Sequence, residues 1–401
     1  MGKEKSKEHV FFYKILFTIL FLIIYMIGRD LPLYGVDITA YSETKLDAQS
    51  VFLQSLSGDF NNYSVFILGM WPYMIASIIA SVYMLIRNSD KTVKVSPKKT
   101  GHLTMLILMI IGCIQAWNKT NSLVYKTLDE PLIFTKCITF MEIIAGMLIV
   151  VMLCNRNQKY GIGGRMAVFL VNIVGGMCSM IVKSQPKDLI LPVAIGLLEI
   201  PIMLILETTE KRIPVQRVSI HNIYADKNYL AYKLNPVGIM PVMFASAVFM
   251  LPVFLCSLLA NTFPTNTTIA YVKSQMTMTR PIGIIVYLAI IWLLEISFAF
   301  LTINPKKTAE GLLKSGDSIL NVYAGEQTKK YLVGTILRFS IYSCTILTIC
   351  MGLPLLLSLK GYIANEVVML PSSIMMTTGL WISYYREARV YRNIDKYKPL
   401  V

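Results

Sequence analysis

Ten runs of mainly apolar residues, most of them long enough to cross a lipid bilayer as a helix, dominate this sequence. The hydrocarbon core of a bilayer is about 30 Å thick, and a helix crosses it with about 20 residues. A soluble core could not bury this much apolar surface, because 55% of the residues are hydrophobic and only 15% are charged. We therefore predict ten transmembrane helices, near 15–28, 64–86, 102–117, 137–154, 165–182, 189–206, 237–259, 282–303, 331–353 and 362–385.

Basic residues are divided unequally between the two sides that ten spans define. The side that holds both chain ends carries 28 of the 38 Lys and Arg residues. Because cytoplasmic loops collect Lys and Arg, we expect both termini in the cytoplasm. The same bias accounts for the net charge of +15, so we do not interpret this charge as nucleic-acid binding. The first apolar run lacks a small-residue cleavage site after it, and we expect it to be a span rather than a removed signal.

Two segments on the basic side are unusually long and contain no apolar run, 207–236 and 304–330. Loops of this length without secondary structure are usually functional. Both segments are basic, which favours the docking of an acidic or large cytoplasmic partner. The alternative is that they are only solvated connectors.

The segment 46–62, on the other side, is too polar to cross the bilayer and too apolar for a free loop. A short helix folded back into the protein would satisfy both properties. Irregular segments persist at membrane depth only where protein buries them or where they line a watery cavity. An interfacial helix lying on the membrane fits the pattern equally well.

Few side chains suggest catalysis. The histidines, His9, His102 and His221, have no neighbours at metal-ligand spacing, and none of the seven cysteines forms a CxxC pair. The glycines at 161–164 are better interpreted as an interhelical turn than as a phosphate loop. We therefore expect no metal, no cofactor and no enzymatic activity. Three carboxylates lie inside spans and leave open an ion-coupled transporter of small molecules: Glu142, Glu199 and Glu295.

A series of motifs resembles the SecY family, in order and at the family's spacing. In the second half these are EKRIPVQ at 210–216, LNPVGIMPVMFASAVF at 234–249, FAFLTINPKKTAEGLLKSG at 298–316 and GEQTKKYL at 325–332. In the first half they are SLSGDFNNYSVFILGMWPYMIASII at 55–79 and KYGIGGRM at 159–166. Together they cover most of the chain.

The resemblance implies an all-α polytopic membrane protein, with ten transmembrane helices in two inverted halves of five around a central pore. A cytoplasmic N-terminus (1–14) would precede the first half (15–182), which includes the segment 46–62. The second half (183–385) would carry the two long loops, and 386–401 would form a cytoplasmic tail.

The resemblance also assigns residues to three sites. The segment 46–62 becomes a plug that closes the outer funnel, with Val51, Phe52, Leu53, Leu56, Ser57 and Gly58. An apolar ring, which seals by dewetting and deforms through its methionines, would comprise Met74, Ile78, Leu170, Val174, Met243 and Met376. The motor-docking loops would present Lys211, Arg212, Arg217, Tyr323, Gly325, Glu326, Gln327, Thr328 and Lys329.

The implied function is a protein-conducting channel in the bacterial plasma membrane. Its substrate would be an unfolded preprotein with a signal sequence. A SecA-type ATPase would supply the energy, and small membrane subunits like SecE and SecG are the expected partners in the bilayer.

The chain departs from the usual pattern at two places. Tyr323 and Ala324 stand where the family usually has an arginine-proline pair, and Arg165 stands where a glycine is usual. The chain is also shorter than housekeeping members. These departures favour an accessory SecY of Gram-positive bacteria, which exports serine-rich glycosylated adhesins. A housekeeping channel and a non-transporting scaffold are the alternatives.

Overall fold

The computed structural model describes residues 10–37, 63–89, 97–126, 131–217, 228–262 and 267–394. The chain divides into two compact units. Unit 1 comprises Met1–Pro186, Asn365–Val367 and Leu380–Val401, and unit 2 comprises Lys187–Ala364 and Val368–Gly379.

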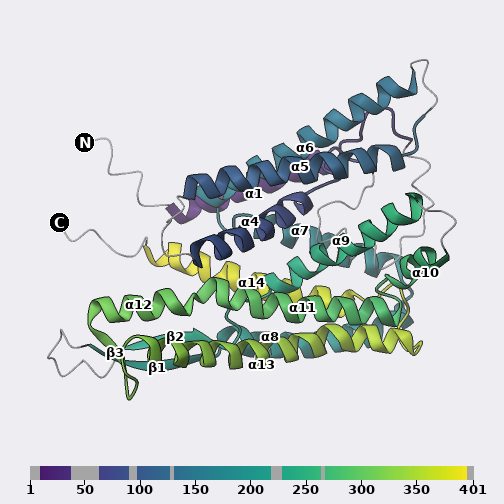
Figure 1. Cartoon of the computed structure of the whole chain (residues 1–401). Coiled ribbons are helices and arrows are strands. Elements are labelled where there is room, and N and C mark those ends of the chain that lie inside the picture. The colour runs from purple at the N-terminus through teal and green to yellow at the C-terminus, as the bar shows by residue number, and fades with distance from the viewer. Residues whose placement is uncertain are drawn as a thin grey trace, which may run out of the picture. The chain divides into compact units, whose positions relative to one another are not determined.

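Five described helices fall in unit 1 (Figure 1): α1 (Val10–Asp30), α4 (Trp71–Ser89), α5 (Pro97–Ser122), α6 (Leu132–Tyr160) and α7 (Met166–Lys183). Unit 2 holds α8 (Pro186–Thr208), α9 (Met240–Thr262), α10 (Thr267–Gln275), α11 (Pro281–Ile303), α12 (Pro305–Ser315) and α13 (Glu326–Leu359). The last helix, α14 (Leu370–Ile394), begins in unit 2 and ends in unit 1.

Each of the ten predicted spans coincides with a helix. Within the described residues, seven of these helices are long and apolar enough to cross a bilayer: α1, α5, α6, α7, α8, α11 and α13. In α4 and α9 the apolar stretch is shorter, 71–83 and 240–253. Helix α14 is more polar, and its first turns bury Ser372 and Ser373, each 1% exposed. The chain is a helical, multi-pass membrane protein.

The beginnings of two spans differ most from the sequence-based expectation. The second and tenth spans were expected to begin near 64 and 362, but their helices begin at Trp71 and Leu370. Proline is the second residue of both helices, and there its missing N–H costs nothing while its fixed φ suits the first turn. Eight of the twelve described helices have proline at the N-cap or in the first two positions. Apolar content predicted the spans, but proline decides where these helices begin.

A buried non-helical segment, residues 63–70, precedes α4 in unit 1. Its backbone pairs with the chain after α1, where the Leu33 N–H donates to the Tyr63 carbonyl at 2.7 Å and the Val65 N–H to the Leu31 carbonyl at 3.0 Å. The Phe66 ring stacks on Tyr25 of α1, with ring centroids 5.9 Å apart. These bonds satisfy part of an irregular backbone that a membrane protein tolerates only when protein surrounds it.

The two long basic segments of unit 2 are not structureless, contrary to the sequence-based expectation. They form a three-stranded antiparallel sheet, ordered β2-β1-β3, from β1 (Glu210–Arg217), β2 (Tyr229–Lys233) and β3 (Asp317–Ile319). Along β1 the side chains alternate, with Ile213 and Val215 buried and their neighbours exposed. This period of two is the pattern of a half-buried strand. Figure 1 shows α11 and α13 side by side, with the strands at one end of the pair.

Candidate functional site

One apolar core joins the two long basic segments of unit 2. Ile213 and Tyr232 come from the first segment, Ala309 and Ile319 from the second, and Leu332 from α13. All five are at most 9% exposed. We call β1, β2, β3, α12 and the first turns of α13 the platform. Because its strands and α12 share one core, residues about 100 positions apart in sequence are held in a fixed arrangement.

The platform holds several of its charges over aromatic rings. The Arg212 guanidinium lies 4.7 Å from the centre of the Tyr229 ring, and its Nη2 is 3.3 Å from Oε1 of Glu210. Lys211 Nζ lies 5.7 Å from the centre of the Phe339 ring. Such contacts between exposed groups contribute little stability. The contacts instead hold the side chains of Lys211 and Arg212, two of the predicted docking residues, in preferred orientations.

Burial raises the pKa of the Tyr232 phenol above its ordinary value, and a hydrogen bond with Thr308 of α12 partly opposes this shift. Tyr232 therefore stays neutral at physiological pH. The phenol also links β2 to α12 inside the core of the platform.

The predicted docking residues around the tip, 323–329, play two different parts. Tyr323 is 80% exposed, and Glu326 and Gln327 are also exposed. Thr328 is only 1% exposed, and its hydroxyl donates to the Tyr323 carbonyl at 2.8 Å. Thr328 thus fixes the tip from inside instead of meeting a partner.

The remaining docking residues also have defined places. Gly325 is the N-cap of α13 with φ at +95°, a conformation that side chains disfavour, and Lys329 is partly exposed in the first turn. Arg217 pairs with Asp317 in the register of β1 and β3. The tip is therefore a turn between β3 and α13 whose backbone conformation glycine permits.

In unit 1 the predicted ring residues lie on α4 and α7. Met74 is buried, whereas Ile78 is partly exposed. Leu170 is partly exposed and Val174 is 45% exposed, so this face of α7 is open. Asn172, two residues from each, lies about 200° away around the helix and is fully buried.

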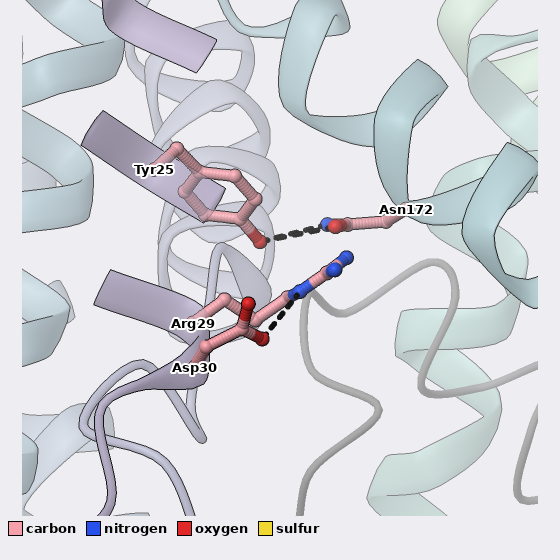
Figure 2. A network of polar contacts seen from close by, with 4 residues as sticks. All are labelled: Tyr25, Arg29, Asp30 and Asn172. Carbon is pink, nitrogen blue, oxygen red and sulfur yellow. Dashed lines mark hydrogen bonds and ion pairs between the residues drawn. The ribbon is translucent and has the colours of Figure 1, made fainter. Parts of the chain in front are cut away.

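The buried face of α7 contacts α1 through a polar pair (Figure 2). The Asn172 amide donates to the Tyr25 hydroxyl at 2.9 Å, and the same hydroxyl lies 3.2 Å from the Asn172 carbonyl oxygen. One turn further along α1, Arg29 Nε is 3.8 Å from Oδ1 of Asp30, and Figure 2 shows the guanidinium beside Asn172. This pair fixes which face of α7 is turned away from α1, namely the face of Leu170 and Val174.

In unit 2 the predicted ring residues are Met243 of α9 and Met376 of α14, which are 4% and 0% exposed. That the six residues encircle one pore stays a prediction. The predicted plug residues, within 46–62, lie outside the described residues. The described chain resumes at the buried segment 63–70.

The glycine-rich segment 161–164 is an interhelical turn, as predicted, between α6 and α7. Gly163 and Gly164 have φ values of +74° and +49°. The Ile162 N–H donates to the Thr18 hydroxyl of α1 at 2.8 Å, and the Gly163 N–H donates to Oε2 of Glu387 in α14 at 3.0 Å. The turn therefore connects α6 and α7 and bonds both to α1 and to the part of α14 that belongs to unit 1.

The three intramembrane carboxylates have separate surroundings. Glu142 of α6 accepts a hydrogen bond from the Tyr34 backbone N–H at 2.9 Å. Glu295 of α11 accepts from the Ser343 hydroxyl at 3.1 Å and is fully buried. Glu199 of α8 is 3% exposed, and neither of its carboxylate oxygens has a hydrogen-bond partner among the described residues. None of these contacts links one carboxylate to another, as a relay would need.

Known proteins match the whole length of this chain. At 28% identity, an accessory Sec system protein translocase subunit SecY2 of Streptococcus agalactiae serotype Ia aligns with 98% of the chain and 96% of its own length. The corresponding subunit of Streptococcus salivarius is 27% identical, with 99% of each chain covered. The solved structure of a protein-conducting channel shares the fold, with a TM-score of 0.69 at 16% identity, covering 96% of this chain and 93% of that one.

The SecY family model matches residues 64–385, which run from the buried segment before α4 to the last turns of α14. That range includes the platform, the turn 161–164 and all six predicted ring positions. The chain belongs to the SecY family.

Proposed function

We propose that this protein is the channel subunit of an accessory Sec translocase and passes unfolded secretory proteins across the bacterial plasma membrane. The observation that carries the proposal is the full-length similarity to accessory Sec subunits, together with the fold of a protein-conducting channel. The serine-rich glycosylated adhesins exported by accessory systems are the proposed substrates.

The proposed pore is closed by the ring of Met74, Ile78, Leu170, Val174, Met243 and Met376. An apolar constriction excludes ions because water is unstable inside it. Methionine has three rotatable bonds and a polarisable thioether, so the ring could yield to chains of different width. The plug would close the outer side of this ring. The protein would then need no catalytic group of its own.

The proposed motor site is the platform, on the cytoplasmic side together with both termini. A rigid basic surface suits an acidic face of a SecA-type ATPase, which would supply the energy. Tyr323 offers an aromatic anchor at the tip, where contact residues of this kind carry much of a binding energy. Small single-span subunits like SecE and SecG are proposed as partners within the membrane.

Deleting the gene in its native host tests the proposal. We expect export of a serine-rich glycoprotein to stop while general secretion and growth continue, since an accessory channel serves few substrates. Loss of viability would instead indicate a housekeeping channel. Normal export of every secreted protein would contradict a channel function.

Point variants in the same strain distinguish a loss of motor binding from a loss of the channel itself. Tyr323→Ala should reduce export by weakening motor binding while leaving the membrane level of the protein unchanged. The matched control is Tyr362→Ala, because Tyr362 is 70% exposed and follows the opposite end of the 34-residue helix α13, about 50 Å along that helix from the tip. Equal export by both variants would show that the tip is not part of the docking site.

A further inference from the structure

The sheet of the platform has an open edge at β2. The strand order is β2-β1-β3, so within the described residues β2 (Tyr229–Lys233) has a neighbouring strand on one side only. A strand at the edge of a sheet presents backbone N–H and C=O groups with which another chain can pair. Which groups of β2 face outward follows from its bonds to β1.

Two backbone hydrogen bonds fix the phase of the ladder between β1 and β2. The Leu234 N–H donates to the Thr209 carbonyl at 2.8 Å, and the Val215 N–H donates to the Asn228 carbonyl at 2.9 Å. Both pairs continue the register of the two strands at its ends. In an antiparallel ladder, residues that bond to the neighbouring strand alternate with residues that do not. Every second residue from 228 to 234 therefore bonds toward β1.

The outward backbone groups belong to Tyr229 and Ala231. Leu230 and Tyr232 are the even-numbered residues of β2, and their N–H and C=O groups face β1. Tyr229 and Ala231 turn theirs the other way, so they present two donors and two acceptors at the open edge. Their side chains are exposed as well, whereas Tyr232 is buried. The edge is thus accessible at the residues whose backbone can pair.

One face of the sheet beside this edge is apolar. Leu230 is partly buried and packs against the core of the platform, which includes Tyr232 of the same strand. An added strand would place every second side chain beside Leu230. An apolar side chain there would extend the core, because neighbouring side chains on one face of a sheet pack together.

The other face beside the edge is basic. Arg212 of β1 lies opposite Ala231 in the register, and its guanidinium reaches across this small residue to lie 4.7 Å from the centre of the Tyr229 ring. The Arg212 side chain is 61% exposed, and Glu210 accepts from only one of its nitrogens. A guanidinium has five N–H donors. An acidic side chain on the added strand would therefore find a cation near the edge.

We propose that the edge of β2 binds an extended segment of a cytoplasmic protein as a fourth strand, with apolar and acidic residues in alternation. In strand addition of this kind, main-chain hydrogen bonds give affinity and the alternate side chains give specificity. The inference rests on the proposed motor site and assigns the segment to the SecA-type ATPase. A second copy of this chain would bring another basic platform against the first, and like charges repel.

Residue-resolved hydrogen exchange tests the pairing directly. The purified full-length channel in neutral detergent is measured alone and with a saturating amount of the purified ATPase. The N–H groups of Tyr229 and Ala231 should exchange rapidly in the channel alone, because they face outward, and slowly once the ATPase is bound. Those of Leu230 and Tyr232 should be protected in both samples by their bonds to β1. Contact through side chains alone would not produce this alternation.

Two variants at one position separate the backbone from the side chain. Ala231→Pro removes an outward N–H, and an edge strand tolerates proline where the N–H faces away from its neighbour. Its affinity for the ATPase should decrease about fivefold or more, since a hydrogen bond is lost and the ring obstructs the added strand. Ala231→Val is the matched control, because it keeps the N–H and favours a strand.

The possible results distinguish this inference from the proposed function. If the ATPase binds but protects neither Tyr229 nor Ala231, or binds both variants equally well, the strand pairing is overturned while the motor site stands. Protection of these two N–H groups in the channel alone would also overturn it, because this chain or a second copy would then cover the edge. A channel that does not bind the ATPase would contradict the motor site and this inference together. If Ala231→Pro does not fold, exchange in the unaltered protein decides.

Discussion

At the scale of residues, the hydrogen-bonded pair of Tyr25 and Asn172 is the clearest contact that determines how two helices of unit 1 pack. Both side chains are fully buried, and each is positioned by the other. A buried amide left without its partner costs about 1–3 kcal/mol, whereas removing both polar groups together can be nearly neutral. The pair therefore acts as one feature, and it orients α7 against α1.

A double-mutant cycle tests this dependence. Tyr25→Phe alone should lower the unfolding free energy by about 1–3 kcal/mol, because Asn172 loses its partner while the ring still packs on Phe66. The double variant Tyr25→Phe, Asn172→Leu should recover part of that loss. Thermal or denaturant unfolding in detergent measures all four proteins. Strictly additive losses would show that the two residues do not depend on each other.

The sequence could not have revealed this pair. Tyr25 and Asn172 lie 147 positions apart, and neither belongs to a motif with a known spacing. A lone tyrosine or asparagine in an apolar run is compatible with many neighbours. Arg165 was recognisable as unusual for the family, yet its guanidinium lies 4.4 Å from the centre of the Tyr73 ring and donates to the Asn155 side-chain oxygen at 3.1 Å. These contacts depend on three helices meeting. Contacts of this kind come from tertiary packing, and local pattern carries no information about them.

At the scale of elements, the packing of segment 63–70 depends on small residues in the helices beside it. A Cβ added at Gly146 of α6 would overlap the backbone carbonyl of Val65. A Cβ at Gly112 of α5 would overlap only the Met147 side chain, which can rotate away. The two glycines are therefore matched in helix context and differ in what they approach.

Gly146→Ala should displace the segment 63–70 and destabilise unit 1, whereas Gly112→Ala should have a small effect. Overpacking against atoms that cannot move typically costs about 1–3 kcal/mol. Protease sensitivity of the purified protein near residue 65, alongside its unfolding temperature, provides the measurement. If Gly112→Ala proved as damaging as Gly146→Ala, the close approach to Val65 would not explain why unit 1 needs glycine at position 146.

The platform gives a second prediction at this scale. Ile213 is 2% exposed in its core, and Ile213→Ala should cost about 2–5 kcal/mol of local stability. Hydrogen exchange should then rise in β1, β2 and β3 while the spans stay protected. Leu313→Ala is the control, because Leu313 is 55% exposed on α12. Uniform loss of protection through the whole of unit 2 would contradict a platform with its own core.

Elements were predictable to different degrees for physical reasons. A span needs about 20 apolar residues, so each of the ten helices was recognisable as an apolar run, although the runs of α4 and α9 are shorter. The residue at which α4 begins was harder to predict, because residues 64–70 are as apolar as the helix that follows. Only Pro72 marks the boundary. The sheet was missed because β2 and β3 have only five and three residues, although the alternation around Ile213 and Val215 in β1 was readable. Pairing between segments about 100 residues apart has no local signature.

For the whole molecule, the sequence and the family support the same architecture, a helical channel, and its basic, folded platform is the proposed surface for a partner. The ring, the plug and the platform take their proposed roles from the family resemblance. Only the platform and individual ring residues are placed by the described structure. The remaining question is whether residues of both units contact the same passing chain.

Photo-crosslinking to a stalled substrate tests that central claim most directly. A small diazirine-bearing residue is placed at Val174 of unit 1 or at Met243 of unit 2, in a reconstituted translocase with its ATPase and a preprotein halted by a folded C-terminal domain. The control position is Leu293 of α11, which is 66% exposed. We predict ATP-dependent adducts with the preprotein at both Val174 and Met243 and few at Leu293. Adducts at neither ring position, or at Leu293 just as often, would contradict a pore lined by both units.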